Sequence, residues 1–228
     1  MFEMSNEQQK QDFIRIVTEN IKRDGIYNLM EYLEDSGFYT SPASTKYHGS
    51  YDGGLLDHSL NVYYALLDEM NFIYGKNWRK KWSDESIAIV ALFHDLCKIG
   101  RYKSVWKNVK NKESGVWEEK KCYEYDSTKF CMGHAALSLQ IINRYMILTD
   151  EEAQAIYWHM GPYDLSDYSN KQELGFAYSR NALAFALNRA DMFSTYVIEN
   201  PDFKYIPDDQ FTDNDNSDSC EDYFITNT

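Results

Sequence analysis

Apolar residues recur at three- and four-residue intervals along most of the chain, which is the spacing of helices with one buried face. Two segments, 101–108 and 116–125, are instead β-prone, and the turn-forming residues 111–115 separate them. We therefore predict a mostly α fold with a small β-hairpin insert at about 100–126. The expected helices cover about 6–23, 26–36, 55–74, 83–100, 133–146, 149–160 and 176–198.

The segment from Ile87 to Gly100 begins with seven apolar residues in a row, which is typical of a central helix that is buried on every side. His94 and Asp95 follow directly, and Lys98 comes three residues later. Burial of an imidazole and a carboxylate is unfavourable unless another group compensates, and a bound cation would satisfy both. The alternative is a buried His–Asp hydrogen bond that only joins two helices.

Histidine is rare in this chain, and its positions are informative. Four of the five histidines fall near the ends of separate predicted helices, where side chains from several helices can share one pocket. These four are His58, His94, His134 and His159, and the fifth is His48. Together with Asp95 and Asp191 they form a nitrogen and oxygen ligand set without thiolates, which suits Mn, Fe, Co, Ni or Zn better than Mg. His58 lies in a first helical turn, where the helix dipole favours its neutral form.

The net charge of −13 is unevenly distributed. Nine acidic residues and one basic residue lie from Glu199 onward, so we predict a domain over 1–200 and an acidic tail, loosely packed or disordered, over 201–228. Between Lys98 and Lys121, eight basic residues face three acidic ones, which suits a small anionic substrate or simply a solvated hairpin. The overall negative charge argues against binding of long nucleic acid.

The composition, 43% hydrophobic and 26% charged, is that of a globular protein long enough to bury one substantial core. Neither a signal peptide nor an apolar run of membrane-spanning length can be recognised. Cys97, Cys122, Cys131 and Cys220 show no C-x-x-C pairing and no zinc-finger spacing. We interpret them as reduced thiols, mostly packing residues, of a cytoplasmic protein that has no membrane partner.

Three segments carry a resemblance to a known family: Gly53 to Leu60 (GGLLDHSL), Leu92 to Gly100 (LFHDLCKIG) and Asn188 to Ser194 (NRADMFS). The order in which they present a histidine, the His-Asp pair and an aspartate resembles the HD superfamily of metal-dependent phosphohydrolases over roughly residues 46–195. Gly133-His134 and Trp158-His159 resemble the extra histidines of the two-metal members, which include phosphodiesterases and 3′–5′ exoribonucleases. The resemblance implies an HD-domain helical bundle.

The resemblance also implies a ligand set. His58, His94, Asp95 and Asp191 would hold a first divalent metal, and Asp95 would bridge to a second one at His134 and His159. Two such ions would activate a water for attack on a phosphate, and Asp95 and Lys98 would be the catalytic residues, with Lys98 neutralising phosphoryl charge. Further candidates for substrate contact, each of which also suits a salt bridge or a packing role, are Lys46, His48, Asp57, Arg101 and Tyr163.

From these features we predict a metal-dependent phosphohydrolase that acts on a small phosphorylated substrate and uses one or two divalent ions. A nucleotide is the preferred substrate by analogy with the superfamily. One alternative is a phosphodiesterase that acts on cyclic nucleotides or short oligonucleotides, which the two extra histidines favour. Another is a non-catalytic regulatory module that keeps the metal pocket and uses the acidic tail for a partner.

Overall fold

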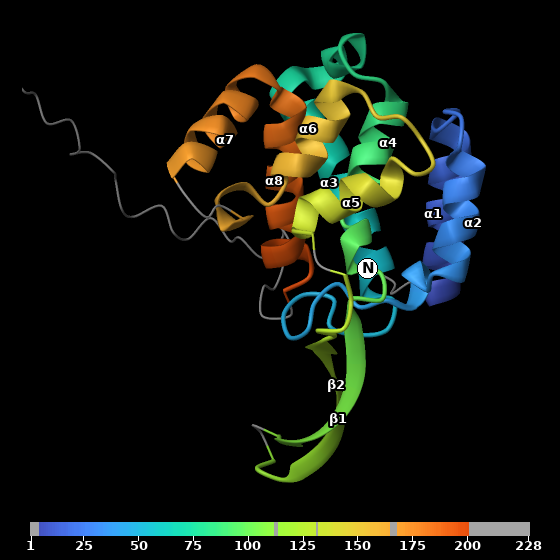
Figure 1. Ribbon diagram of the computed structural model, residues 1–228, viewed down its shortest axis with the longest axis vertical. Coiled ribbons are helices and arrows are strands. Elements are labelled where there is room, and N and C mark those ends of the chain that lie inside the picture. Colours follow the sequence, from blue (N-terminus) through green and yellow to red (C-terminus); the bar gives the residue numbers. More distant parts are fainter. Residues whose placement is uncertain (1–4, 112–113, 131, 165–167, 201–228) are drawn as a thin grey trace, which may run out of the picture.

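The computed structural model describes residues 5–111, 114–130, 132–164 and 168–200, and the predicted acidic tail lies outside them. The described chain is mostly helical with one two-stranded hairpin, which confirms the predicted mostly α class (Figure 1). None of its helices is both long and apolar enough to cross a membrane. The helices and strands are α1 (Asn6–Asn20), α2 (Ile26–Asp35), α3 (Gly54–Tyr74), α4 (Asp84–Phe93), β1 (Tyr102–Lys110), β2 (Trp117–Tyr125), α5 (His134–Ile142), α6 (Asp150–Trp158), α7 (Tyr168–Arg180) and α8 (Ala182–Phe193).

Helices α3 and α4 form the centre of the helical body. Helix α3 packs against α4 and α8, and α4 also packs against α1 and α6. Every residue of α4 from Ile87 to Phe93 is buried, as the uninterrupted apolar run predicts. The helix begins where the hydroxyl of Ser83 accepts a hydrogen bond from the backbone N–H of Ser86. The polar residues that follow α4 therefore emerge in the middle of the protein.

Helix α4 ends at Phe93, so the prediction of one helix as far as Gly100 is wrong. His94 caps the helix, and its Nδ1 lies 2.8 Å from the carbonyl oxygen of Ala91, one of the last carbonyls that lack a partner within the helix. Asp95 then leaves the helical backbone (φ −111°, ψ 20°), and a 3₁₀ turn follows over Leu96–Lys98. The His-Asp pair thus belongs to a helix end rather than to a helix interior.

The last predicted helix, 176–198, is also divided. Helix α7 ends at Arg180, and α8 begins after Asn181, whose side-chain oxygen accepts a hydrogen bond from the backbone N–H of Leu183. Asparagine is among the best N-capping residues, which explains the break. A π-helical turn over Ser194–Ile198 follows α8, and such turns often occur at functional sites. This turn determines where Glu199 lies.

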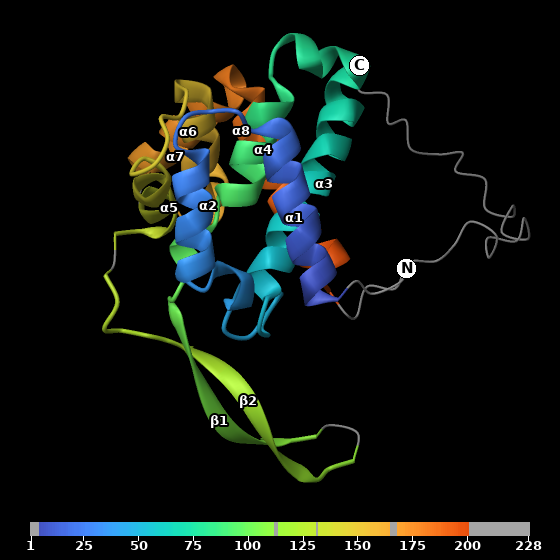
Figure 2. The ribbon, with the colours of Figure 1, turned by 90° about the vertical axis from the view of Figure 1, so that its right-hand side faces the viewer.

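The predicted hairpin is confirmed and projects from the helical body (Figures 1 and 2). Strands β1 and β2 are antiparallel, with Tyr102 opposite Tyr125. Most of their side chains are exposed, but Tyr123 is buried and its hydroxyl donates a hydrogen bond to Asp52 (2.6 Å). The loop that precedes α3 therefore anchors the base of the hairpin.

That loop packs tightly against the start of α3 through Gly54. A Cβ atom added to Gly54 would lie 2.1 Å from the carbonyl oxygen of Gly49, a backbone atom that has little room to move. The same carbonyl accepts a hydrogen bond from the N–H of Ala43 (2.8 Å). Gly54 therefore fixes the path of the loop segment that carries Lys46 and His48.

We expect Gly54→Ala to displace this loop and to lower the free energy of unfolding by about 1–3 kcal/mol, as overpacking does. Denaturant unfolding measures the effect. Gly175→Ala in α7 is the matched control, because a Cβ atom there meets no atom within 4 Å. Equal stability of Gly54→Ala and the control would show that the loop is not confined in this way.

Candidate metal centre

The structure brings the six predicted ligands together from five helices. His58 lies in the second turn of α3, and Asp191 lies near the end of α8. His94 and His159 are the C-capping residues of α4 and α6, and His134 is the first residue of α5. Most of these side chains are buried, which is unusual for groups of this kind unless they are paired or bind a metal.

Asp95 lies at the centre of this cluster, and its two carboxylate oxygens face different histidines. Oδ2 is 3.4 Å from Nε2 of His58 and 3.4 Å from Nε2 of His94. Oδ1 is 2.6 Å from Nε2 of His134 and 3.5 Å from Nε2 of His159. Asp191 completes the first side, with Oδ1 3.2 Å from Nε2 of His58. The arrangement is that of a carboxylate placed between two groups of ligands.

The other ring nitrogen, Nδ1, is held by an acceptor in three of these histidines. Nδ1 of His94 lies 2.8 Å from the carbonyl of Ala91, and Nδ1 of His159 lies 2.6 Å from the carbonyl of Ile156. A carbonyl only accepts, so Nδ1 carries the proton and Nε2 of the neutral ring keeps its lone pair. Nε2 of His159 is buried and forms no hydrogen bond within the described chain. The donor set therefore fits a divalent metal.

The carboxylates strongly affect the pKa of His58. Burial opposes the charged ring, but Glu199, Asp191 and Asp95 outweigh burial and raise the pKa of His58 well above its usual value. The expectation from the helix dipole took no account of these carboxylates, which favour the charged ring. In turn, although burial opposes their ionisation, nearby cationic groups lower the pKa of Asp95 and that of Asp191. A cation at this position would replace the proton in the same negative field.

Lys98 is the cationic partner of the cluster. Its Nζ lies 2.5 Å from Oδ2 of Asp95. Burial lowers the pKa of Lys98, but Asp95 and Asp191 outweigh this effect and raise it above the usual value. Lys98 therefore stays charged although it is buried, and it also lines the adjacent cavity.

This cavity has a volume of about 790 Å³ and contains three of the predicted substrate residues, Lys46, His48 and Tyr163. Burial, followed by the charge of Lys98, lowers the pKa of His48 to about 4. The other two candidates, Asp57 and Arg101, lie outside the cavity lining. Asp57 accepts a hydrogen bond from the hydroxyl of Tyr51, and Arg101 donates one to the carbonyl of Phe130. Local partners thus hold both side chains.

Two residues of the cluster were not predicted. Glu199 was counted only as the first of the C-terminal acidic residues, yet its Oε1 lies 2.9 Å from Nδ1 of His58 and accepts a hydrogen bond from Asn61 (3.0 Å). Cys97 was interpreted as a packing residue, but its Sγ lies 3.3 Å from Nδ1 of His134. With Asp95 and His134 it forms a group that could hold a metal, and the predicted ligand set without thiolates does not include it.

The position of Cys97, two residues after Asp95, was a signal that could have been used. Glu199 gave no comparable signal, because it follows a turn that the sequence did not reveal.

The fold and the site define a mostly α protein with a buried histidine–aspartate cluster that can hold a metal ion. Comparisons with models of known protein families, with curated proteins and with solved structures give no match. The resemblance to the HD superfamily therefore rests on the sequence motifs alone.

Proposed function

We propose that this chain is a metal-dependent phosphohydrolase that hydrolyses a phosphate ester of a small substrate. The observation that carries the proposal is the position of Asp95, whose two oxygens face separate histidine pairs beside a cavity of about 790 Å³. Carboxylate and imidazole ligands beside a cavity that also contains a buried lysine are suited to a phosphate group.

In this proposal the first ion is held by His58, His94, Asp95 and Asp191, and the second by Asp95, His134 and His159. Bound divalent ions supply Lewis acidity and lower the pKa of a coordinated water. Asp95 places its oxygens toward both positions, and the hydrogen bonds at Nδ1 keep the histidine rings oriented. Lys98 neutralises charge on the phosphoryl group, because it lines the cavity and its side chain stays charged.

A nucleotide is the preferred substrate because the cavity combines cations with aromatic rings. Tyr47 and Tyr163 line it with exposed fractions of 77% and 67%, and Tyr196 is 52% exposed. Exposed rings of this kind can stack on a nucleobase. Lys46 lines the same cavity and can contact a terminal phosphate.

A second candidate function is that of a phosphodiesterase that acts on cyclic nucleotides or short oligonucleotides. The specific observation in its favour is the placement of His134 and His159 at the same oxygen of Asp95. This placement provides a second ion position, and paired ions can stabilise both the attacking and the leaving oxygen of a diester.

Assays with p-nitrophenyl phosphate, bis(p-nitrophenyl) phosphate and a nucleotide panel, each with Mn²⁺, Fe²⁺, Co²⁺, Ni²⁺, Zn²⁺ or Mg²⁺, test both candidates. Preferential hydrolysis of the monoester supports the first candidate, and preferential hydrolysis of the diester supports the second. If no ester is hydrolysed with any of these ions, the enzyme proposal is wrong, and the protein is a binding module.

His134→Ala is expected to remove one equivalent of bound metal, because Nε2 of His134 is the nitrogen closest to Oδ1 of Asp95. Equilibrium dialysis followed by elemental analysis measures the stoichiometry. Gln140→Ala, a substitution elsewhere in α5, serves as the control. An unchanged metal content in His134→Ala would exclude the second ion position at this residue.

A further inference from the structure

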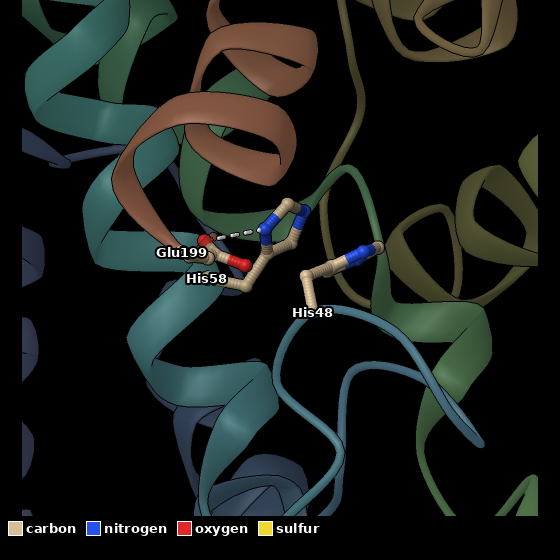
Figure 3. A group of neighbouring side chains, drawn as sticks. All are labelled: His48, His58 and Glu199. Carbon is tan, nitrogen blue, oxygen red and sulfur yellow. Dashed lines mark hydrogen bonds and ion pairs between the residues drawn. The ribbon is translucent and has the colours of Figure 1, made fainter. Parts of the chain in front are cut away.

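A second group of possible ligands lies on the far side of His58 from Asp95. It consists of His48, His58 and Glu199, and one ligand atom of each lies within 4.8 Å of the others. Figure 3 shows that these residues come from the loop before α3, from α3 itself and from the helical turn that follows α8. Nε2 of His58 faces Asp95, so its Nδ1 is on the side of Glu199.

Several buried polar atoms of this group have no hydrogen-bond partner within the described chain. Oε1 of Glu199 is occupied by His58 and Asn61, but the buried Oε2 has no hydrogen-bond partner within the described chain. Both ring nitrogens of His48 are buried and lack such a partner in the same way. Unpaired buried polar atoms are unfavourable, so a group absent from the protein chain is expected to satisfy them.

The local charge favours a cation as that group. The side chain of Glu199 is only 6% exposed, and its carboxylate lies against Nδ1 of His58 and the amide of Asn61. An anionic group is therefore placed away from bulk water at this position. A divalent cation can accept lone pairs from these oxygen and nitrogen atoms. Its positive charge also offsets the negative charge of the buried carboxylate.

We propose that His48 and Glu199 bind a divalent cation of their own, separate from the ions at Asp95. Glu199 orients His58 with Oε1 and binds this cation with Oε2. Metal bonds of about 2.0–2.2 Å place ligand atoms about 3–4 Å apart, which is compatible with ligand atoms that lie within 4.8 Å of one another in this group. Since both residues line the cavity, its remaining coordination positions are open to water or to a phosphate oxygen.

The inference goes beyond the proposed function, because it concerns metal binding alone and needs no substrate. The test uses the full chain and equilibrium dialysis against Mn²⁺ and, separately, Zn²⁺. We expect His48→Ala and Glu199→Gln each to bind one equivalent less than the wild type. Lys46→Ala is the matched control, because Lys46 belongs to the same loop and lines the same cavity but is not a metal ligand. Circular dichroism verifies that all variants are folded.

Anomalous diffraction from Mn²⁺- or Zn²⁺-soaked crystals of the wild type gives a measurement that needs no variant. The expected result is a peak between His48 and Glu199, in addition to any peak at Asp95. An unchanged stoichiometry in His48→Ala, or density for water alone at this position, would overturn the proposal. A lower stoichiometry in Glu199→Gln only would also overturn it, because Glu199 would then act solely by orienting His58.

If the proposed enzyme function is wrong but the additional metal site exists, the experiments give a different pattern of results. In that case phosphate esters remain intact, while the metal stoichiometry of the wild type and of His48→Ala still differs by one.

Discussion

Replacement of Asp95 by asparagine is expected to remove bound metal and to lower phosphate-ester hydrolysis by about 10³-fold or more. Asparagine keeps the shape of the side chain but removes its negative charge and replaces one carboxylate oxygen with an NH₂ group, which cannot bind a cation. Each tenfold loss of rate corresponds to about 1.36 kcal/mol, and loss of a metal that polarises a phosphate removes several kcal/mol of transition-state stabilisation. Both histidine pairs would lose their shared carboxylate.

Metal analysis and steady-state kinetics on the full chain measure the two effects, and denaturant unfolding shows whether the variant is folded. Asp52→Asn is the matched control, because Asp52 also pairs with a lysine but lies 59% exposed at the base of the hairpin. We expect the control to keep its metal and its activity. Asp95→Asn with full metal content and full turnover would mean that Asp95 has only a structural role.

The sequence was sufficient for the elements that depend on local chemistry. Ser83 caps α4, and the capping box of Thr149 and Glu152 opens α6, as the residue types predict. The apolar run in α4 identified the central helix. The positions of the histidines near helix ends were visible for the same reason, since caps and glycines mark where helices begin and end.

The convergence of these helix ends was not derivable from local patterns, and the motif resemblance supplied the expectation instead. The structure shows a local reason for the placement at two of them. His94 and His159 each follow a helix and direct Nδ1 to the carbonyl three residues earlier, Ala91 or Ile156. A histidine at a helix C-terminus is thereby oriented by its own helix, and its Nε2 points away from the helix end.

The features that the sequence did not predict were missed for physical reasons. A helix-wide apolar pattern does not reveal a capping asparagine or a π-helical turn, so the break at Asn181 and the position of Glu199 were missed. Cys97 was judged by its spacing from other cysteines, whereas its partner is a histidine 37 residues away. Long-range contacts of this kind depend on how the helices pack rather than on sequence neighbours.

Arg23→Met is expected to lower the free energy of unfolding by about 3 kcal/mol at neutral pH, because it leaves a buried carboxylate without its partner. Both terminal nitrogens of Arg23 donate to the carboxylate of Glu152, whose side chain is 1% exposed, and one also donates to Glu85. This ion pair connects the segment after α1 to α6, the helix that ends at Trp158 and has His159 as its C-capping residue. Loss of the pair should therefore also loosen the position of His159.

The loss of unfolding free energy in Arg23→Met should depend on pH. Burial raises the pKa of Glu152, but hydrogen bonds from Arg23 and from the N–H of Thr149 outweigh it, and the folded-state pKa is lowered. In the wild type this contribution to stability is present above the unfolded pKa of about 4.3 and is lost as the pH falls through the folded pKa. Without Arg23, burial raises the pKa of Glu152. Protonation of Glu152 at low pH then removes the unpaired buried charge, and the variant is less destabilised.

The stability difference between wild type and Arg23→Met should thus be largest near pH 7 and shrink toward pH 4, as measured by denaturant unfolding across that range. Arg15→Met is the control, because Arg15 pairs with Asp12 and Glu19 at the surface, where such pairs contribute about 0–1 kcal/mol. A difference that stays constant with pH, or that equals the control, would mean that Arg23 stabilises the fold by packing rather than by its charge on Glu152.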